Sequence, residues 1–154
     1  MEFTSSEDIE APLDEVFAKL SDFDAIERQM LRRGVEVKRR EAYSEPVAGM
    51  TWDASFSFRG KARDAEITLS KFDKPEHMEF TSISSGLEVV TQIDCVPLSR
   101  SRTRIAAKVA LNPRTLPARL LVQSMKLART KLNKRFAKRM REFARDFENK
   151  LRAA

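Results

Sequence analysis

The sequence has little of several residue types that build well-known functional sites. Among its 154 residues there are one cysteine, one histidine and four glycines. A single cysteine excludes an internal disulfide and argues against a thiolate metal site, and a single histidine excludes a site with two histidine ligands. There is no glycine-rich phosphate loop, which argues against nucleotide binding. We therefore expect neither a metal nor a cofactor.

Long apolar runs are also missing. No stretch approaches the roughly 18 apolar residues that a membrane-spanning helix needs. The first ten residues, MEFTSSEDIE, are polar and acidic, so no signal peptide is expected and a cytoplasmic location is predicted. The length fits one domain over residues 1–154.

Acidic residues are scarce near the C-terminus. From Arg114 onward the chain has 13 Lys and Arg but only 3 Asp and Glu, and no acid lies between Arg114 and Arg141. Several of the basic residues fall on one helix face: Lys126, Lys134, Lys138, Arg141 and Arg145. Such a face is either simply solvated or contacts an anionic surface, such as a membrane at its periphery. Nucleic acid is not expected as a partner, because no exposed aromatic residues alternate with the basic ones.

The same C-terminal stretch predicts a single long helix over about residues 113–151. Asn112 is a good N-cap, Pro113 suits the first helical position, and no glycine follows. Apolar residues recur every three or four positions, which places them in one stripe along the helix: Leu121, Met125, Ala128, Leu132, Phe136, Met140, Phe143, Phe147 and Leu151. This stripe must be buried against the rest of the chain.

The rest of the chain predicts a sheet that can bury the stripe. A first strand covers residues 2–10, and two short helices follow, the second ending near Gly34. Six antiparallel strands then alternate apolar and polar residues up to Leu111, most clearly from Trp52 to Phe58. The predicted fold is α+β: a seven-stranded antiparallel sheet wrapped around a long C-terminal helix, with two short helices between strands one and two. Because a straight helix cannot follow a twisted sheet along its whole length, a cavity between them is expected.

Several short motifs resemble the START and birch-pollen-allergen superfamily, including its polyketide cyclase-like and coenzyme Q-binding members. They are Ile9-Glu-Ala-Pro12, Val16-Phe17, Leu20-Ser-Asp22, Gly49-Met-Thr-Trp52, Pro75-Glu76 and Thr103. The resemblance spans essentially the whole chain and implies the helix-grip fold. It also implies an apolar internal cavity for a lipid-like or aromatic small molecule. Because this fold hosts carriers, receptors and enzymes alike, the resemblance does not assign a reaction.

The residues expected to line such a cavity lie on the inward phase of the strands and helix. They are Trp52, Phe56, Phe58, Ile67, Leu69, Phe80, Leu87, Val89, Thr91, Ile93, Met125, Leu132, Phe136 and Met140. Binding pockets for small molecules are mostly apolar, with a few well-placed polar groups. The alternative is that these side chains fill a closed core.

Chemistry in the cavity would need an inward-facing acid or base. Glu7 is a weak candidate because it shares its phase with Phe3 and Ile9, although it can equally point to solvent at an edge position. The sequence therefore favours a non-catalytic carrier or sensor of a hydrophobic ligand. Two alternatives stay open: a polyketide cyclase- or dehydratase-like enzyme using Glu7 or Thr91, and an interaction protein that docks its basic helix on an anionic surface.

Overall fold

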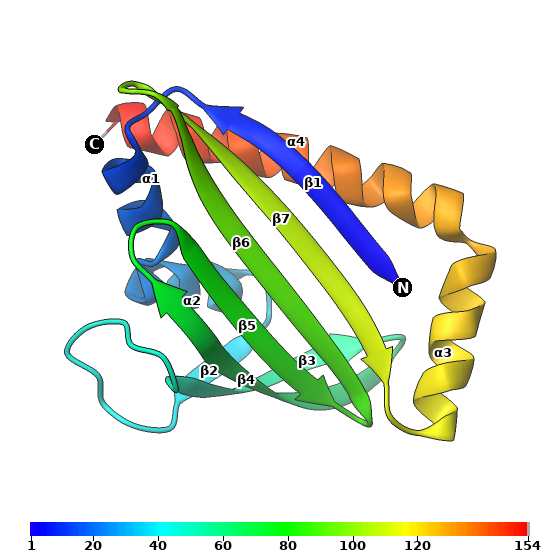
Figure 1. Cartoon of the computed structure of the whole chain (residues 1–154). Helices are drawn as coiled ribbons and strands as arrows, with labels where there is room; N and C mark the ends of the chain where they lie inside the picture. The colour runs from blue at the N-terminus through cyan, green and yellow to red at the C-terminus, as the bar shows by residue number, and fades with distance from the viewer. Residues whose placement is uncertain (154) are drawn as a thin grey trace.

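A computed structural model describes residues 1–153 and shows a seven-stranded antiparallel sheet with helices at one end and along one face (Figure 1). The spatial order of the strands is β1-β7-β6-β5-β4-β3-β2. The elements in chain order are β1 (Glu2–Ile9), α1 (Leu13–Leu20), α2 (Phe23–Arg32), β2 (Glu36–Arg39), β3 (Thr51–Phe58), β4 (Lys61–Asp73), β5 (His77–Ser84), β6 (Leu87–Ser99), β7 (Arg102–Pro113), α3 (Leu116–Leu127) and α4 (Arg129–Ala153). The predicted α+β helix-grip architecture is confirmed.

Tight turns set the register of the two central hairpins. Arg59 and Gly60 alone connect β3 to β4, and both have positive φ, at 52° and 75°. Ser85 and Gly86 connect β5 to β6 in the same way, at 47° and 78°. Two consecutive residues with positive φ match a type I′ turn, whose twist suits paired strands. The register therefore brings Phe56 opposite Arg63 and places both side chains on the same face of the sheet.

The closed core lies at the end of the sheet that α1 and α2 cover. Phe17 of α1 is fully buried and packs against Phe72, with ring centroids 5.4 Å apart. Phe23 of α2 meets Trp52 edge-on at 5.2 Å and Phe80 at 5.9 Å. The apolar faces of the two short helices thus seal this end of the molecule.

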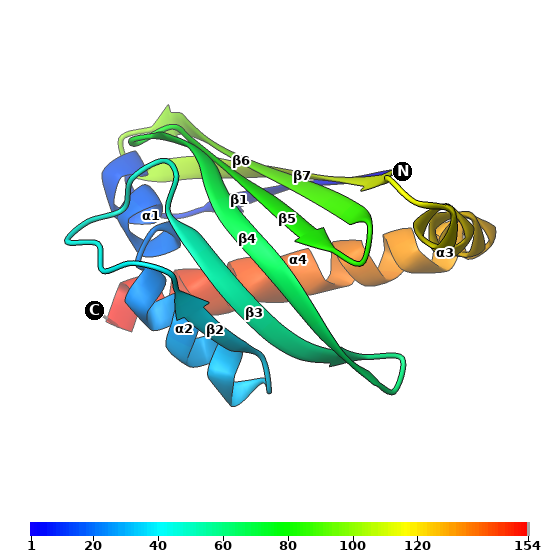
Figure 2. The same cartoon turned by 90° about the horizontal axis from the view of Figure 1, so that it is seen from below.

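The C-terminal helix is not continuous, so the prediction of one helix over about 113–151 is wrong in two respects. Strand β7 stays paired with β6 as far as Pro113, and the helix cap is Thr115, whose Oγ1 accepts from the Ala118 amide at 3.3 Å. The chain then breaks at Ala128, between α3 and α4. Neither glycine nor proline marks the break. The two helices instead pack on different strands, since α3 meets the end of β7 whereas α4 runs beneath β1 (Figures 1 and 2).

The convex face of the sheet is polar and carries several ion pairs. Arg40 bridges Asp53 and Glu66, each at 2.9 Å, and Arg104 holds Asp8 at 2.8 Å. Hydrogen bonding to these arginines lowers the pKa of Asp53 and of Asp8. The ion pairs identify this face as the solvated side of the sheet, so a site for an apolar molecule belongs on the concave side.

Candidate functional site: an apolar groove beside α3

A large hollow opens between α3 and the hairpin ends of the sheet. Its volume is about 680 Å³, within the range of pockets that bind small molecules. We call it the α3 groove. It is lined by Met30, Val35, Ala54, Phe56, Phe58, Arg59, Arg63, Ala65, Ile67, Ser82, Ser84, Ser85, Leu87, Val89, Leu111, Pro117, Ala118, Leu121 and Met125.

The walls of the α3 groove come from elements far apart in the sequence. Two small residues, Ala54 and Ala65, lie opposite each other on β3 and β4 and leave room there. Ile67 pairs with Ser82, which in turn pairs with Val89, so one row of side chains crosses three strands. Helix α3 supplies the facing wall. The small size of the alanines and the short contact of α3 with the sheet together keep the groove open.

Two arginines stand among these apolar walls. Arg63 is half-buried on the concave side, opposite Phe56, and its Nε donates to the Phe58 carbonyl at 3.4 Å. The guanidinium carbons of Arg59 and Arg63 lie 5.4 and 5.6 Å from the centroid of the Phe58 ring, within cation–π distance. Within residues 1–153, neither arginine forms a salt bridge.

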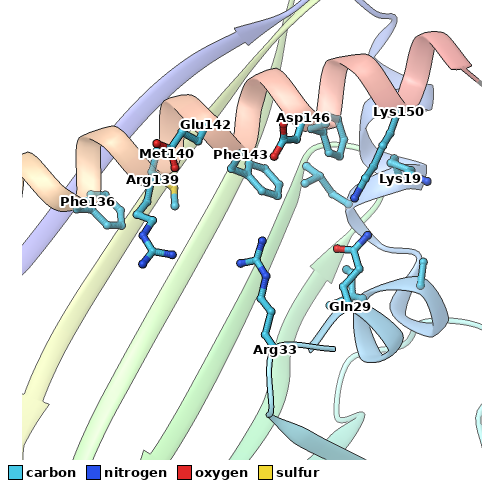
Figure 3. Close-up of a pocket in the computed structure, with 14 residues that line it drawn as sticks. Lys19, Gln29, Arg33, Phe136, Arg139, Met140, Glu142, Phe143, Asp146 and Lys150 are labelled. Atoms are coloured by element: carbon cyan, nitrogen blue, oxygen red, sulfur yellow. The ribbon is translucent and has the colours of Figure 1, made fainter. Parts of the chain in front are cut away.

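A second hollow, of about 490 Å³, lies between the short helices and α4 (Figure 3). Phe136, Met140 and Phe143 form part of its apolar wall. Charged side chains surround it: Arg33 points up from the end of α2 while Arg139 points down from α4 (Figure 3). The acids Glu142 and Asp146 also line this hollow, so charges of both signs surround it on exposed helix surfaces. It is therefore a weaker candidate for an apolar ligand than the α3 groove.

All but two of the predicted cavity-lining residues divide among three environments. Phe56, Phe58, Ile67, Leu87, Val89 and Met125 line the α3 groove. Phe136 and Met140 line the second hollow. Trp52, Leu69, Phe80 and Ile93 belong to or pack against the closed core, and Thr91 and Leu132 line neither hollow. Trp52, Leu69, Phe80 and Ile93 are part of the core or pack against it because α1 and α2 cover the end of the concave face to which these side chains point.

Glu7 lies on the concave side, as its phase predicted, but away from both hollows. It is half-buried and sits opposite Ile105, which is buried and pairs on its other side with Cys95. Glu7 lines neither hollow, and within residues 1–153 its carboxylate has no hydrogen-bond partner. This position gives it no access to a molecule in the α3 groove, so the enzyme hypothesis built on Glu7 and Thr91 gains no support.

Other reactive groups are held in structural roles. Burial raises the pKa of the Cys95 thiol to about 11, with the nearby Asp94 adding to the effect, so Cys95 is protonated at neutral pH. Glu79 is buried and accepts from Gln92 at 3.0 Å and Ser70 at 2.9 Å, bonds that lower its pKa despite burial. Among residues 1–153, no three His, Cys, Asp or Glu side chains gather in a way that could hold a metal.

The predicted anionic-surface residues are all exposed. Lys126 lies on α3, and Lys134, Lys138, Arg141 and Arg145 lie on α4. The only salt bridge of these helices in the described chain joins Arg152 to Glu148. Apart from this pair, the basic residues of both helices form no salt bridge within the described chain, in contrast to several charges on the convex face of the sheet. No helix in residues 1–153 is long and apolar enough to cross a membrane.

Comparison with protein families decides the classification. Residues 1–148 match the family described as "Polyketide cyclase / dehydrase and lipid transport". The chain belongs to this family. No curated protein matches the chain. Sequence comparison therefore assigns it to the polyketide cyclase and lipid transport family and to no individual protein.

Solved structures show the same fold at low sequence identity. Ara h 8.0201 is 13% identical with a TM-score of 0.64, covering 100% of this chain and 99% of its own. A START superfamily protein from Mycobacterium smegmatis is 11% identical with a TM-score of 0.56, covering 87% and 95%. Norcoclaurine synthase from Thalictrum flavum, solved with dopamine and hydroxybenzaldehyde, is 11% identical with a TM-score of 0.59, covering 81% and 76%. These likenesses agree with the helix-grip fold of the polyketide cyclase and lipid transport family.

Proposed function

We propose that this protein binds a hydrophobic small molecule in the α3 groove and acts as a non-catalytic carrier or sensor. The observation that supports this most directly is the groove itself: about 680 Å³ enclosed mainly by aliphatic and aromatic side chains in a molecule whose core is closed elsewhere. The family description, which includes lipid transport, is consistent with such a ligand. A cytoplasmic location stays a prediction.

Burial of the ligand's carbon atoms supplies most of the affinity in this proposal. Removing roughly 250 Å² of carbon surface from water contributes about 6 kcal/mol at about 25 cal/mol per Å². A micromolar dissociation constant needs about 8 kcal/mol. Apolar contact alone therefore gives weak binding, and a polar anchor is needed for tight and oriented binding.

A titration with the neutral fluorescent probe N-phenylnaphthylamine tests this function. We expect saturable binding to one site with increased probe fluorescence, because the apolar groove excludes water from the probe. Native mass spectrometry of the freshly purified protein, followed by extraction, should reveal a co-purified apolar molecule in the same site. Absence of saturable binding to the neutral probe and to fatty acids, together with a ligand-free mass, would rule the carrier function out.

A second function is favoured by a separate observation on the outer face of α3. We propose that this face docks on anionic lipid bilayers. Leu116, Leu120 and Leu127 are 67%, 57% and 92% exposed, and their spacing of four and seven residues puts them on one side of the helix. Arg119 and Lys126 flank them. Exposed leucines beside unpaired positive charge complement both the acyl region and the headgroups of such a bilayer.

Co-sedimentation with vesicles tests the docking proposal. We expect binding to vesicles containing phosphatidylglycerol, no binding to pure phosphatidylcholine, and release as salt rises, because each basic residue near the surface contributes about 1 kcal/mol. The double variant Leu120→Glu/Leu127→Glu should abolish binding. Leu98→Glu, at an exposed leucine near the far end of β6, is the matched control and should bind like wild type. Failure of the wild-type protein to bind anionic vesicles at low salt would remove this proposal.

A further inference from the structure

We infer that the molecule held in the α3 groove carries an anionic head group, a carboxylate or phosphate, which Arg63 and Arg59 bind at the hairpin end. This inference rests on the proposed carrier function and names its ligand class. Apolar and charged residues are unevenly represented in the lining of the groove. Most of its lining is apolar, and the two arginines are its only ionisable residues.

The direction of Arg63 is fixed by strand register. Residues opposite each other in an antiparallel pair project to the same face. Arg63 faces Phe56, just as Ala65 faces Ala54 two residues further along, so the Arg63 side chain projects into the groove with the apolar residues. Arginines elsewhere on the sheet, such as Arg40 and Arg104, point to the convex face and have carboxylate partners.

The bonding capacity of Arg63 is largely unused. A guanidinium presents five N–H donors in a planar fork that matches a carboxylate or phosphate. Within residues 1–153, Arg63 uses one of them, toward the Phe58 carbonyl. Half-burial removes part of its water without supplying a counter-charge. An anion at this position would restore the lost interaction through charge-assisted hydrogen bonds.

The turn supplies a second positive group at the same place. Because only Arg59 and Gly60 connect the strands, Arg59 is held close to Arg63, and both guanidiniums lie against the Phe58 ring. Two like charges on one ring repel each other, and an anion between them would relieve that repulsion. The side-chain hydroxyl of Ser82, also in the groove wall, makes no hydrogen bond within the described chain and can donate one.

The combined arrangement selects an amphipathic anion. Its apolar body would lie along the alanine and valine rows toward α3, and its charged end would lie at the β3–β4 turn. A wholly neutral apolar molecule would leave both arginines without a partner. A small inorganic anion would leave the apolar walls unfilled.

Displacement of bound N-phenylnaphthylamine by a matched pair of ligands tests the inference. The pair is lauric acid and lauryl alcohol, which have the same alkyl chain and differ in the charge of the head group. Lauryl phosphate is added as a third ligand, to distinguish a preference for phosphate from a preference for carboxylate. On wild type, we expect laurate or lauryl phosphate to bind at least about tenfold more tightly than the alcohol, the factor typical of a charged hydrogen bond. The double variant Arg59→Gln/Arg63→Gln should lose that advantage and keep its affinity for the alcohol.

Three further variants test whether charge, and charge at this position, causes the preference. Lys74→Gln removes a positive charge at the exposed turn between β4 and β5, outside the groove, and should behave like wild type. Arg63→Lys keeps the charge and should retain part of the preference for the anion. Phe58→Ala removes the ring between the arginines and should weaken both ligands. Denaturant unfolding of each variant confirms that it is folded.

The outcomes separate the inference from the function on which it rests. If neither laurate nor lauryl phosphate bound wild type more tightly than the alcohol, or if the double variant lost the anions and the alcohol equally, the anionic head group would be overturned and the carrier function would stand. Failure of the probe and of all three chain ligands to bind would overturn both.

Discussion

Replacing Phe17 with alanine is expected to lower the free energy of unfolding by about 3–5 kcal/mol. The Phe17 ring is fully buried between α1 and the sheet and packs against Phe72. Truncation loses its burial and leaves a cavity that the close-packed aromatic cluster around Phe23 and Trp52 cannot fill. Equilibrium unfolding in urea, monitored by the fluorescence of Trp52, measures the change directly.

Phe58→Ala is the matched control for this substitution. The Phe58 ring is 41% exposed at the mouth of the α3 groove, so its removal should change the unfolding free energy by less than about 1 kcal/mol. Ligand binding should separate the same two variants in the reverse sense: Phe58→Ala weakens it, whereas Phe17→Ala leaves it unchanged, because Phe58 lines the groove and Phe17 does not. Equal destabilisation by the two substitutions would contradict the division of the molecule into a closed core and an open groove.

Replacing Ala65 with tryptophan is expected to abolish ligand uptake without unfolding the protein. Ala65 lies on the floor of the α3 groove, opposite Ala54, where an indole would occupy the space that a ligand needs. We expect the dissociation constant for N-phenylnaphthylamine to rise by at least about tenfold, which corresponds to 1.4 kcal/mol. Fluorescence titration measures this, and far-ultraviolet circular dichroism checks the fold.

Ala62→Trp places the same indole on the same strand but on the other face. Ala62 is exposed and pairs with Ser57, which alternates with the groove-facing Phe56 and Phe58. Its replacement should leave probe binding unchanged. If Ala65→Trp bound the probe as tightly as Ala62→Trp does, the ligand site would have to lie elsewhere, and the second hollow beside α4 would become the leading candidate.

The sheet was predictable from the sequence because its signals are local. Alternation from Trp52 to Phe58 follows from the period of two in a strand, and Gly60 and Gly86 mark turns that require positive φ. The break at Ala128 has no such signal, since the apolar stripe continues through it. Helix α3 packs against β7, and its buried residues are Ala118 and Val122. This packing sets the direction of the helix and depends on residues distant in the sequence.

The site was less predictable because it depends on which end of the concave face the short helices cover. Phase alone treats Trp52 and Phe56 alike, although Trp52 is sealed beneath Phe23 and Phe56 lines the groove. The sequence does not single out Arg63, because a charged side chain interrupts the apolar alternation that marks groove-facing positions. Arg63 precedes Ala65 and Ile67 by two and four residues, and this two-residue period predicts that its side chain lies on the same concave face.

Helix α3 is attached to the molecule by a narrow set of contacts. Of its 12 residues, only Ala118 and Val122 are buried. A helix of this length is barely stable alone in water, so its persistence depends on that small interface and on the Thr115 cap. We therefore expect local unfolding of α3 to need much less free energy than global unfolding, and its amide protons to exchange with solvent before those of the central strands. The wall of the groove can open by melting one short helix while the sheet remains intact, which gives a ligand a path that crosses no part of the closed core.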